Sequence, residues 1–144
     1  MSIQDAAAEI KDDFSFLEDW EDRYAHIIDL GKSLAPLAPE EMNDDTKVRG
    51  CASQVWLISE TSATTPGGLS FRGASDAILV SGLIALLLSL FTDRTPDEIL
   101  AFDADAFFAE IGVDQALSPQ RSNGFKSMLE RIRNDAADAA ALNV

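Results

Sequence analysis

The feature that most restricts the fold of this sequence is an apolar run from Ala77 to Phe91, interrupted only by two serines and a glycine. Its residues are apolar almost all round a helix, whereas a surface helix has one apolar stripe and a polar face. The run is shorter than the roughly 20 residues that a membrane-spanning helix needs. We therefore expect a central buried helix, with Ser75 and Asp76 capping its start.

Helical periodicity predicts two helices before this run. The first covers Ile3 to Asp13, with apolar residues on one face. Ser15 and Glu18 form a capping-box pattern at the start of the second, in which each side chain satisfies a backbone N–H of the other. Apolar residues then recur at three- to four-residue spacing, and the helix is expected to end near Leu34, before two prolines.

Further helices are predicted after the apolar run. The segment Thr95–Glu98 combines an N-cap residue, a proline and a capping box, and so begins a short helix. That helix is expected to break near Asp103 and to resume through Ile111. Ser118 begins the last helix, which becomes alanine-rich past Asp135 and is expected to fray over residues 135–144.

Strand signals lie in the middle of the chain. Residues Gln54–Ile58 are rich in β-branched and aromatic types, Thr64–Gly68 reads as a turn, and Leu69–Arg72 as the returning strand of a hairpin. The pattern contains no internal repeat and no long flexible linker. It predicts an α+β fold, a small antiparallel sheet of two or three strands packed against several helices, in one domain over residues 1–144.

The charge of the chain restricts its partners. Its 144 residues carry 25 acidic and 11 basic side chains, a formal net charge of −14. Such an excess of carboxylates argues against nucleic acid and against an anionic membrane surface. It suits a partner with a basic patch, although solubility alone is the more common reason for such a charge. The N-terminus resembles neither a secretory signal nor a transit peptide, so we expect a cytoplasmic protein.

Cys51 is the candidate for chemistry, and it is the only cysteine of the chain. It follows Gly50, which suits a tight loop, and Lys47 and Arg49 lie nearby in sequence. A neighbouring cation favours the thiolate, which is the nucleophilic form of cysteine. On spacing alone, however, a single cysteine is more often a small buried apolar residue.

The sequence lacks the residues that other kinds of catalytic or metal site need. His26 is the only histidine, and its place among apolar helix positions is more typical of a packed histidine than of a base. One cysteine and one histidine cannot form a four-ligand zinc site, and no nucleotide-binding motif occurs. Arg121 is unusual because it lies in the first turn of the last helix, where the helix dipole disfavours a cation. An exposed ion pair explains it equally well.

Four segments carry a resemblance to a known family. The segment KVRGCASQVWL at residues 47–57 resembles the SufE family of sulfur-acceptor proteins, which includes the CsdE branch. Three further stretches agree in the same order: Asp19, Trp20, Glu21, Tyr24 and residues 27–31; Gly73, Ser75, Asp76, Ala77, Val80 and residues 82–85; and Leu117, Ser118, Pro119, Arg121, Ser122 and Gly124. The similarity spans about residues 14–134.

The resemblance implies a SufE/IscU-like fold and a specific function. A pyridoxal-phosphate cysteine desulfurase of the SufS or CsdA type holds sulfur as a persulfide, and the thiolate of Cys51 takes it. Sulfur then passes to an iron–sulfur scaffold or another acceptor. The pyridoxal phosphate belongs to the partner, so the resemblance implies no cofactor or metal on this chain. It also implies an accessory protein, monomeric alone, rather than a stand-alone enzyme.

The resemblance also suggests supporting residues around Cys51. These are residues expected to shape the loop or the docking surface: Lys47, Arg49, Gly50, Gln54, Asp76 and Arg121. Two alternatives stay open: an adaptor that activates a desulfurase by docking without carrying sulfur, and a thiol redox sensor. The sensor is disfavoured because the chain has no resolving cysteine, and an iron–sulfur scaffold because clusters need several thiolates.

Overall fold

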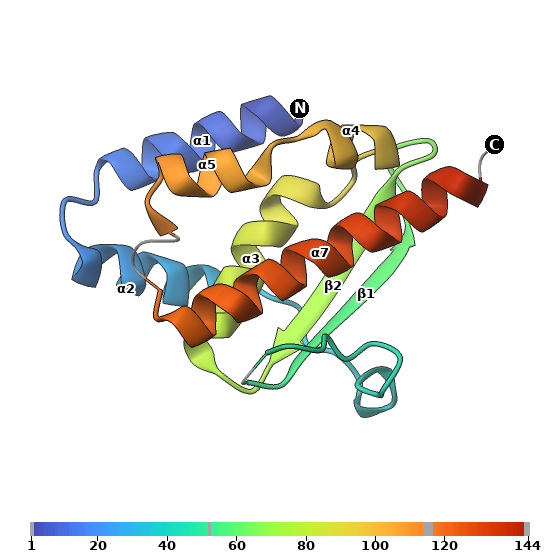
Figure 1. Ribbon diagram of the computed structural model, residues 1–144, viewed down its shortest axis with the longest axis horizontal. Helices are drawn as coiled ribbons and strands as arrows, with labels where there is room; N and C mark the ends of the chain where they lie inside the picture. The colour runs from blue at the N-terminus through green and yellow to red at the C-terminus, as the bar shows by residue number, and fades with distance from the viewer. Residues whose placement is uncertain (1, 52, 114–116, 143–144) are drawn as a thin grey trace.

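The computed structural model describes residues 2–51, 53–113 and 117–142, and it confirms the predicted α+β class. A two-stranded antiparallel sheet lies beside a central helix, with the remaining helices around it (Figure 1). The elements are α1 (Ile3–Ser15), α2 (Trp20–Gly31), the short 3-10 helix η1 (Pro39–Glu41), β1 (Val55–Thr61), β2 (Leu69–Ser75), α3 (Ile78–Phe91), α4 (Pro96–Ala101), α5 (Ala104–Glu110) and α7 (Pro119–Leu142).

Helix α3 is the buried centre that the apolar run predicts. Its leucines face α1, α2, β2 and α7, and Leu86, Leu87 and Leu90 have no exposed surface. The glycine within the run is explained by α2, since a Cβ on Gly82 would lie 2.0 Å from the carbonyl oxygen of Ile27. The two helix backbones can approach this closely only because that side chain is missing. Within the described residues, no helix is both long and apolar enough to span a membrane.

The predicted start of the second helix was wrong. Ser15 is the last residue of α1, and its hydroxyl donates to the carbonyl oxygen of Asp12 at 2.6 Å. The N-cap of α2 is Asp19, whose side chain accepts from the backbone N–H of Asp22 at 2.9 Å. The first helix runs further than expected because Phe14 is buried and continues its apolar face.

The predicted cap of α3 was also wrong. Ala77 occupies the N-cap position and makes no side-chain cap. Ser75 closes β2, and its hydroxyl donates to the carbonyl oxygen of Gln54 at 2.7 Å. Asp76 accepts from the backbone N–H of Gln54 at 3.0 Å. Both side chains therefore fasten the residue before β1 to the start of α3, instead of capping the helix.

The C-terminal half follows the predictions except at its end. The capping box of Thr95 and Glu98, the break at Asp103 and the start of α7 after Ser118 are all confirmed. Fraying past residue 135 was expected, but α7 continues to Leu142. Alanine is the best helix former, and Ala136 is fully buried, so this end has both propensity and packing.

Candidate functional site

The Cys51 loop, described over residues 49–51 and 53–54, lies between a short extended segment and β1. That segment runs antiparallel to β1: the N–H of Val48 donates to the carbonyl oxygen of Val55 at 2.8 Å, and the N–H of Leu57 to that of Thr46 at 2.9 Å. These bonds close the base of the loop on both sides. Cys51 is therefore held between two fixed ends, as a hairpin tip is.

Gly50 has the conformation that the loop requires. Its φ of 88° lies in the left-handed region that other residues rarely adopt. A Cβ on Gly50 would also lie 2.6 Å from the hydroxyl oxygen of Ser127 on α7. The turn therefore requires glycine, and a side chain at this position would also displace the hydroxyl of Ser127.

The thiol of Cys51 is half-buried and turned toward α7. Its Sγ lies 3.4 Å from the carbonyl oxygen of Gly124, a geometry in which the S–H can donate. Beside it is a pocket of about 310 Å³ that mixes apolar and polar side chains. Its lining consists of Cys51, Ser53, Val80, Leu83, Ser118, Gln120, Arg121, Gly124, Phe125 and Met128. The pocket gives the thiol a partly sheltered space.

The electrostatics of the thiol differ from the expectation. Burial raises the pKa of the Cys51 thiol, and no lysine or arginine of the described residues offsets this. The predicted lowering by Lys47 and Arg49 was wrong for this conformation. Arg49 is exposed and lies 4.0 Å from the exposed carboxylate of Asp44. Lys47 and Arg49 line a separate hollow against α7, which does not include Cys51.

Gln54 and Asp76 meet at the end of the loop. The carboxylate of Asp76 accepts the backbone N–H of Gln54, and the N–H of Asp76 faces the carbonyl oxygen of Gln54 at 3.3 Å. Asp76 thus positions the loop through the backbone, and its own side chain is exposed. Arg121 is brought to the site, where it lines the pocket wall with Cys51.

Helix α7 supplies contacts to the loop from residues that were not among the predicted site residues. Gly124 contacts Cys51, Ser127 contacts Gly50, and Arg131 donates to the carbonyl oxygens of Asp45 and Lys47 at 2.7 and 3.3 Å. These positions follow the helical repeat and so lie on one face of α7. Nothing local in the sequence indicates that this face meets a loop so far away in the chain.

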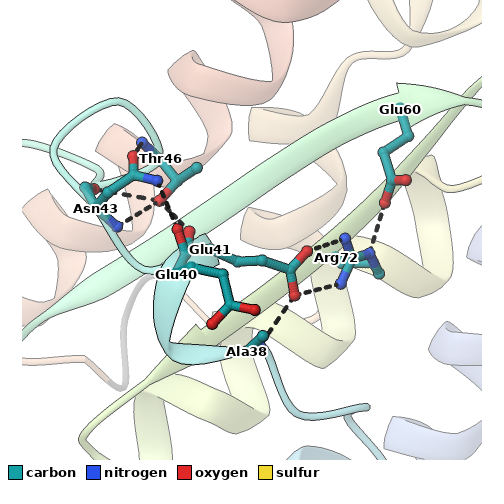
Figure 2. A network of polar contacts seen from close by, with 7 residues as sticks. All are labelled: Ala38, Glu40, Glu41, Asn43, Thr46, Glu60 and Arg72. Atoms are coloured by element: carbon teal, nitrogen blue, oxygen red, sulfur yellow. Dashed lines mark hydrogen bonds and ion pairs between the residues drawn. The ribbon is translucent and has the colours of Figure 1, made fainter.

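A second polar network holds the segment that leads to the loop. Figure 2 shows Arg72 of β2 between two carboxylates, Glu41 of η1 and Glu60 of β1. Glu41 also accepts the backbone N–H of Ala38 at 2.9 Å. The hydrogen bond from Arg72 lowers the pKa of Glu41 to about 2, so this carboxylate stays charged at neutral pH. η1 is in this way fastened to the outer face of the hairpin.

Three further features bear on the choice of site. A larger hollow, about 390 Å³, lies between α5 and α7, but no cysteine lines it and its charged residues are of both signs. Within residues 2–51, 53–113 and 117–142, no cluster of three or more His, Cys, Asp or Glu side chains is arranged to hold a metal ion. His26 packs edge-on against Phe14 of α1, as the sequence suggests. Cys51 is thus the centre of the candidate site.

Comparisons with known proteins agree on the family. The model of the SufE family, described as an Fe–S metabolism associated domain, matches residues 8–136. An uncharacterized SufE-like protein of Rhizobium etli is 49% identical over 134 residues, which cover 92% of this chain and 90% of that protein. A second, from Rhizobium meliloti, is 43% identical over 129 residues, covering 89% and 92%.

The fold is also shared with a solved structure. The solution structure of a hypothetical protein from Thermus thermophilus superimposes with a TM-score of 0.75 at 17% identity, covering 94% of this chain and 96% of that one. At this identity the similarity concerns the fold alone. The family match over most of the chain and the two relatives carry the assignment further: this chain belongs to the SufE family.

Proposed function

We propose that this protein accepts sulfur from a cysteine desulfurase onto Cys51, carries it as a persulfide and delivers it for iron–sulfur cluster assembly. The observation that carries the proposal is the placement of the only cysteine at the tip of a closed loop, beside a partly apolar pocket. The family's link to Fe–S metabolism supports it. Within the described residues, no group of three or more His, Cys, Asp or Glu side chains is arranged as an alternative metal-binding centre.

The chemistry is an exchange between sulfurs. The Cys51 thiolate attacks the outer sulfur of the desulfurase persulfide, so that one S–S bond forms on Cys51 as the S–S bond of the donor breaks. The desulfurase thiolate leaves and takes up a proton, while Cys51 ends as a persulfide. No electrons enter or leave the pair of proteins. The pyridoxal phosphate that generates the sulfur belongs to the partner, and this chain needs no cofactor of its own.

In the resting protein the Cys51 thiol is protected rather than activated. The raised pKa of Cys51 and its contact with Gly124 keep the thiol protonated and turned inward. Attack on a partner persulfide therefore requires the loop to turn outward when the desulfurase docks. Gly50, at the edge of the loop, has the backbone freedom for such a turn. We place this exchange in the cytoplasm, with a monomer binding its partner.

The burial of the thiol also favours one alternative, an adaptor that activates the desulfurase by docking alone. Intact-mass measurement after incubation with a cysteine desulfurase and L-cysteine tests the proposal. Cys51 should gain the mass of one sulfur, and the variant Cys51→Ser should gain none and should not stimulate sulfide release. A matched variant outside the site, Ser89→Ala, should behave as the wild type. If Cys51→Ser still stimulates fully while the wild type gains no sulfur, the adaptor is correct.

A further inference from the structure

Gly124 is a glycine that the fold does not require. It lies inside α7 and is buried, and glycine is a poor helix former compared with alanine. Elsewhere the helical glycines have a packing reason: a Cβ on Gly31 or Gly82 would lie within 3 Å of the backbone of the opposite helix. Gly124 has no such conflict, because its added Cβ would be in ordinary contact with its neighbours.

Those neighbours all belong to one residue. The three nearest atoms to a Cβ on Gly124 are the Sγ, Cα and Cβ of Cys51, at 3.5, 3.7 and 3.7 Å. The reduced thiol would therefore accept alanine at this position without rearrangement. The missing side chain leaves free space directly beside Sγ, on the side of the pocket that Gly124 and Cys51 both line.

We propose that the space at Gly124 receives the outer sulfur of a Cys51 persulfide, so that Gly124 determines how well the loop stores sulfur. An outer sulfur lies about 2.05 Å from Sγ, well inside the distance at which a Cβ would stand. A sulfur atom and a methyl group are of similar size, so both cannot occupy this space. The inference rests on the proposed function, because it concerns the loaded state of the same cysteine.

The rest of the pocket lining would protect the stored sulfur. Val80, Leu83 and Met128 line it with apolar surface, which shields the outer sulfur from thiols and water. The sulfur of Sγ loses its proton on loading and can no longer donate to the carbonyl of Gly124. The loss of this hydrogen bond would by itself let the loop turn outward. Because the outer sulfur fits into the space beside Gly124, the loaded cysteine stays inward.

The variant Gly124→Ala tests the inference, with Asn123→Ala as the matched control on the exposed side of α7. Each protein is loaded with sodium tetrasulfide, whose terminal sulfur Cys51 takes as trisulfide leaves, and then freed of excess reagent. Intact mass follows the decay of the persulfide, and thermal unfolding is measured for the reduced and the loaded forms. Because loading is chemical, the test does not depend on a desulfurase.

In the reduced form, Gly124→Ala should unfold at the same temperature as the wild type or a few degrees higher, since alanine favours the helix. In the loaded form it should unfold at a lower temperature than the loaded wild type. Its persulfide should decay at least about fivefold faster, and Asn123→Ala should match the wild type in every form. Equal persulfide lifetimes in Gly124→Ala and the wild type would overturn the inference, as would a lower unfolding temperature of the reduced variant.

The same proteins separate this inference from the proposed function. In a second experiment a cysteine desulfurase and L-cysteine replace the tetrasulfide. If the wild type takes no sulfur from the desulfurase but Gly124→Ala still shortens the lifetime of chemically loaded persulfide, the storage site stands and the carrier function fails. If the wild type is loaded by the desulfurase and the variant keeps sulfur equally long, the carrier function stands and the role of Gly124 fails.

Discussion

The sulfur of Cys51 lies 3.4 Å from the carbonyl oxygen of Gly124, a residue 73 positions further along the chain. This contact turns the thiol inward, against the final helix, in the resting protein. It also places a carbonyl oxygen where a thiolate would be repelled, in keeping with the direction in which burial moves the pKa of Cys51. The reactivity of this thiol is therefore governed by the position of its loop.

Alkylation of Cys51 should be slow in the folded protein. Its rate should rise with pH only above the pH range in which an exposed cysteine thiol ionises. The raised pKa leaves less thiolate at neutral pH, and thiolate is the form that reacts with iodoacetamide. At pH 7.5 we expect the folded chain to react at least about threefold more slowly than the same chain in urea. A folded rate equal to the unfolded one would contradict the inward position of the thiol.

Asp76→Ala should loosen the loop and expose Cys51. The substitution removes the acceptor for the backbone N–H of Gln54, a hydrogen bond to a charged group at the base of the loop. A loss of about 1 kcal/mol in the closed loop corresponds to roughly fivefold faster alkylation at fixed pH. Asp12→Ala, on the exposed face of α1, is the control and should leave the rate unchanged. An unchanged rate in Asp76→Ala would remove Asp76 from the role of loop anchor.

Gly50→Ala should destabilise the protein by about 2 kcal/mol or more. A left-handed φ costs a residue with a Cβ about 1–2 kcal/mol, and the new methyl would also overlap the hydroxyl of Ser127. Combining Gly50→Ala with Ser127→Ala should recover the second part of the loss but not the first. Urea unfolding of the two single variants and the double variant measures this coupling, and purely additive effects would refute the contact.

Arg131→Ala should destabilise the chain by about 1–3 kcal/mol, because Arg131 donates to two backbone carbonyls and faces Asp135 at 3.4 Å. The loss should depend on pH. Burial raises the pKa of Asp135, so charging this carboxyl disfavours the folded state, and Arg131 opposes that effect. The difference in stability between wild type and variant should therefore grow as pH rises from about 4 to 7. A difference that is constant over this range would contradict the pairing.

Glu41→Gln should lower stability at neutral pH but not in strong acid. The pKa of Glu41 is lowered to about 2 by its hydrogen bond from Arg72, so its contribution is present above the ordinary glutamate range and is lost as pH falls toward 2. Thermal unfolding of the two proteins at pH 7 and at pH 2 measures this. Glu9→Gln, on α1, is the control, and its unfolding temperature at pH 7 should equal that of the wild type.

The sequence predicted the elements that depend on local pattern. The buried helix α3, the hairpin and the capping box of Thr95 all follow from periodicity or from short-range hydrogen bonds. It failed where a polar side chain had two possible partners. Ser15 and Asp76 both resemble N-caps, but one ends its own helix and the other bonds a residue 22 positions earlier.

The candidate site was predicted in part for the same reason. Cys51 and Gly50 could be singled out from their local context, but the electrostatics of the thiol could not. Lys47 and Arg49 are near Cys51 in sequence, yet the side chains of both line a hollow against α7, and Arg49 faces Asp44. Burial by α7 decides the pKa instead, and the contact with Gly124 is a tertiary one that no local pattern reports.

The closure of the Cys51 pocket by α7 has a consequence for biosynthesis. A domain generally folds as a unit, so contacts with its last helix cannot form until the ribosome has released that helix. Cys51, the hairpin and α3 emerge before the helix that shelters the thiol. During translation the cysteine is therefore an open nucleophile, and it becomes a protected one only when the last helix docks. Any damage to the thiol by oxidants or stray electrophiles should fall most heavily on nascent chains.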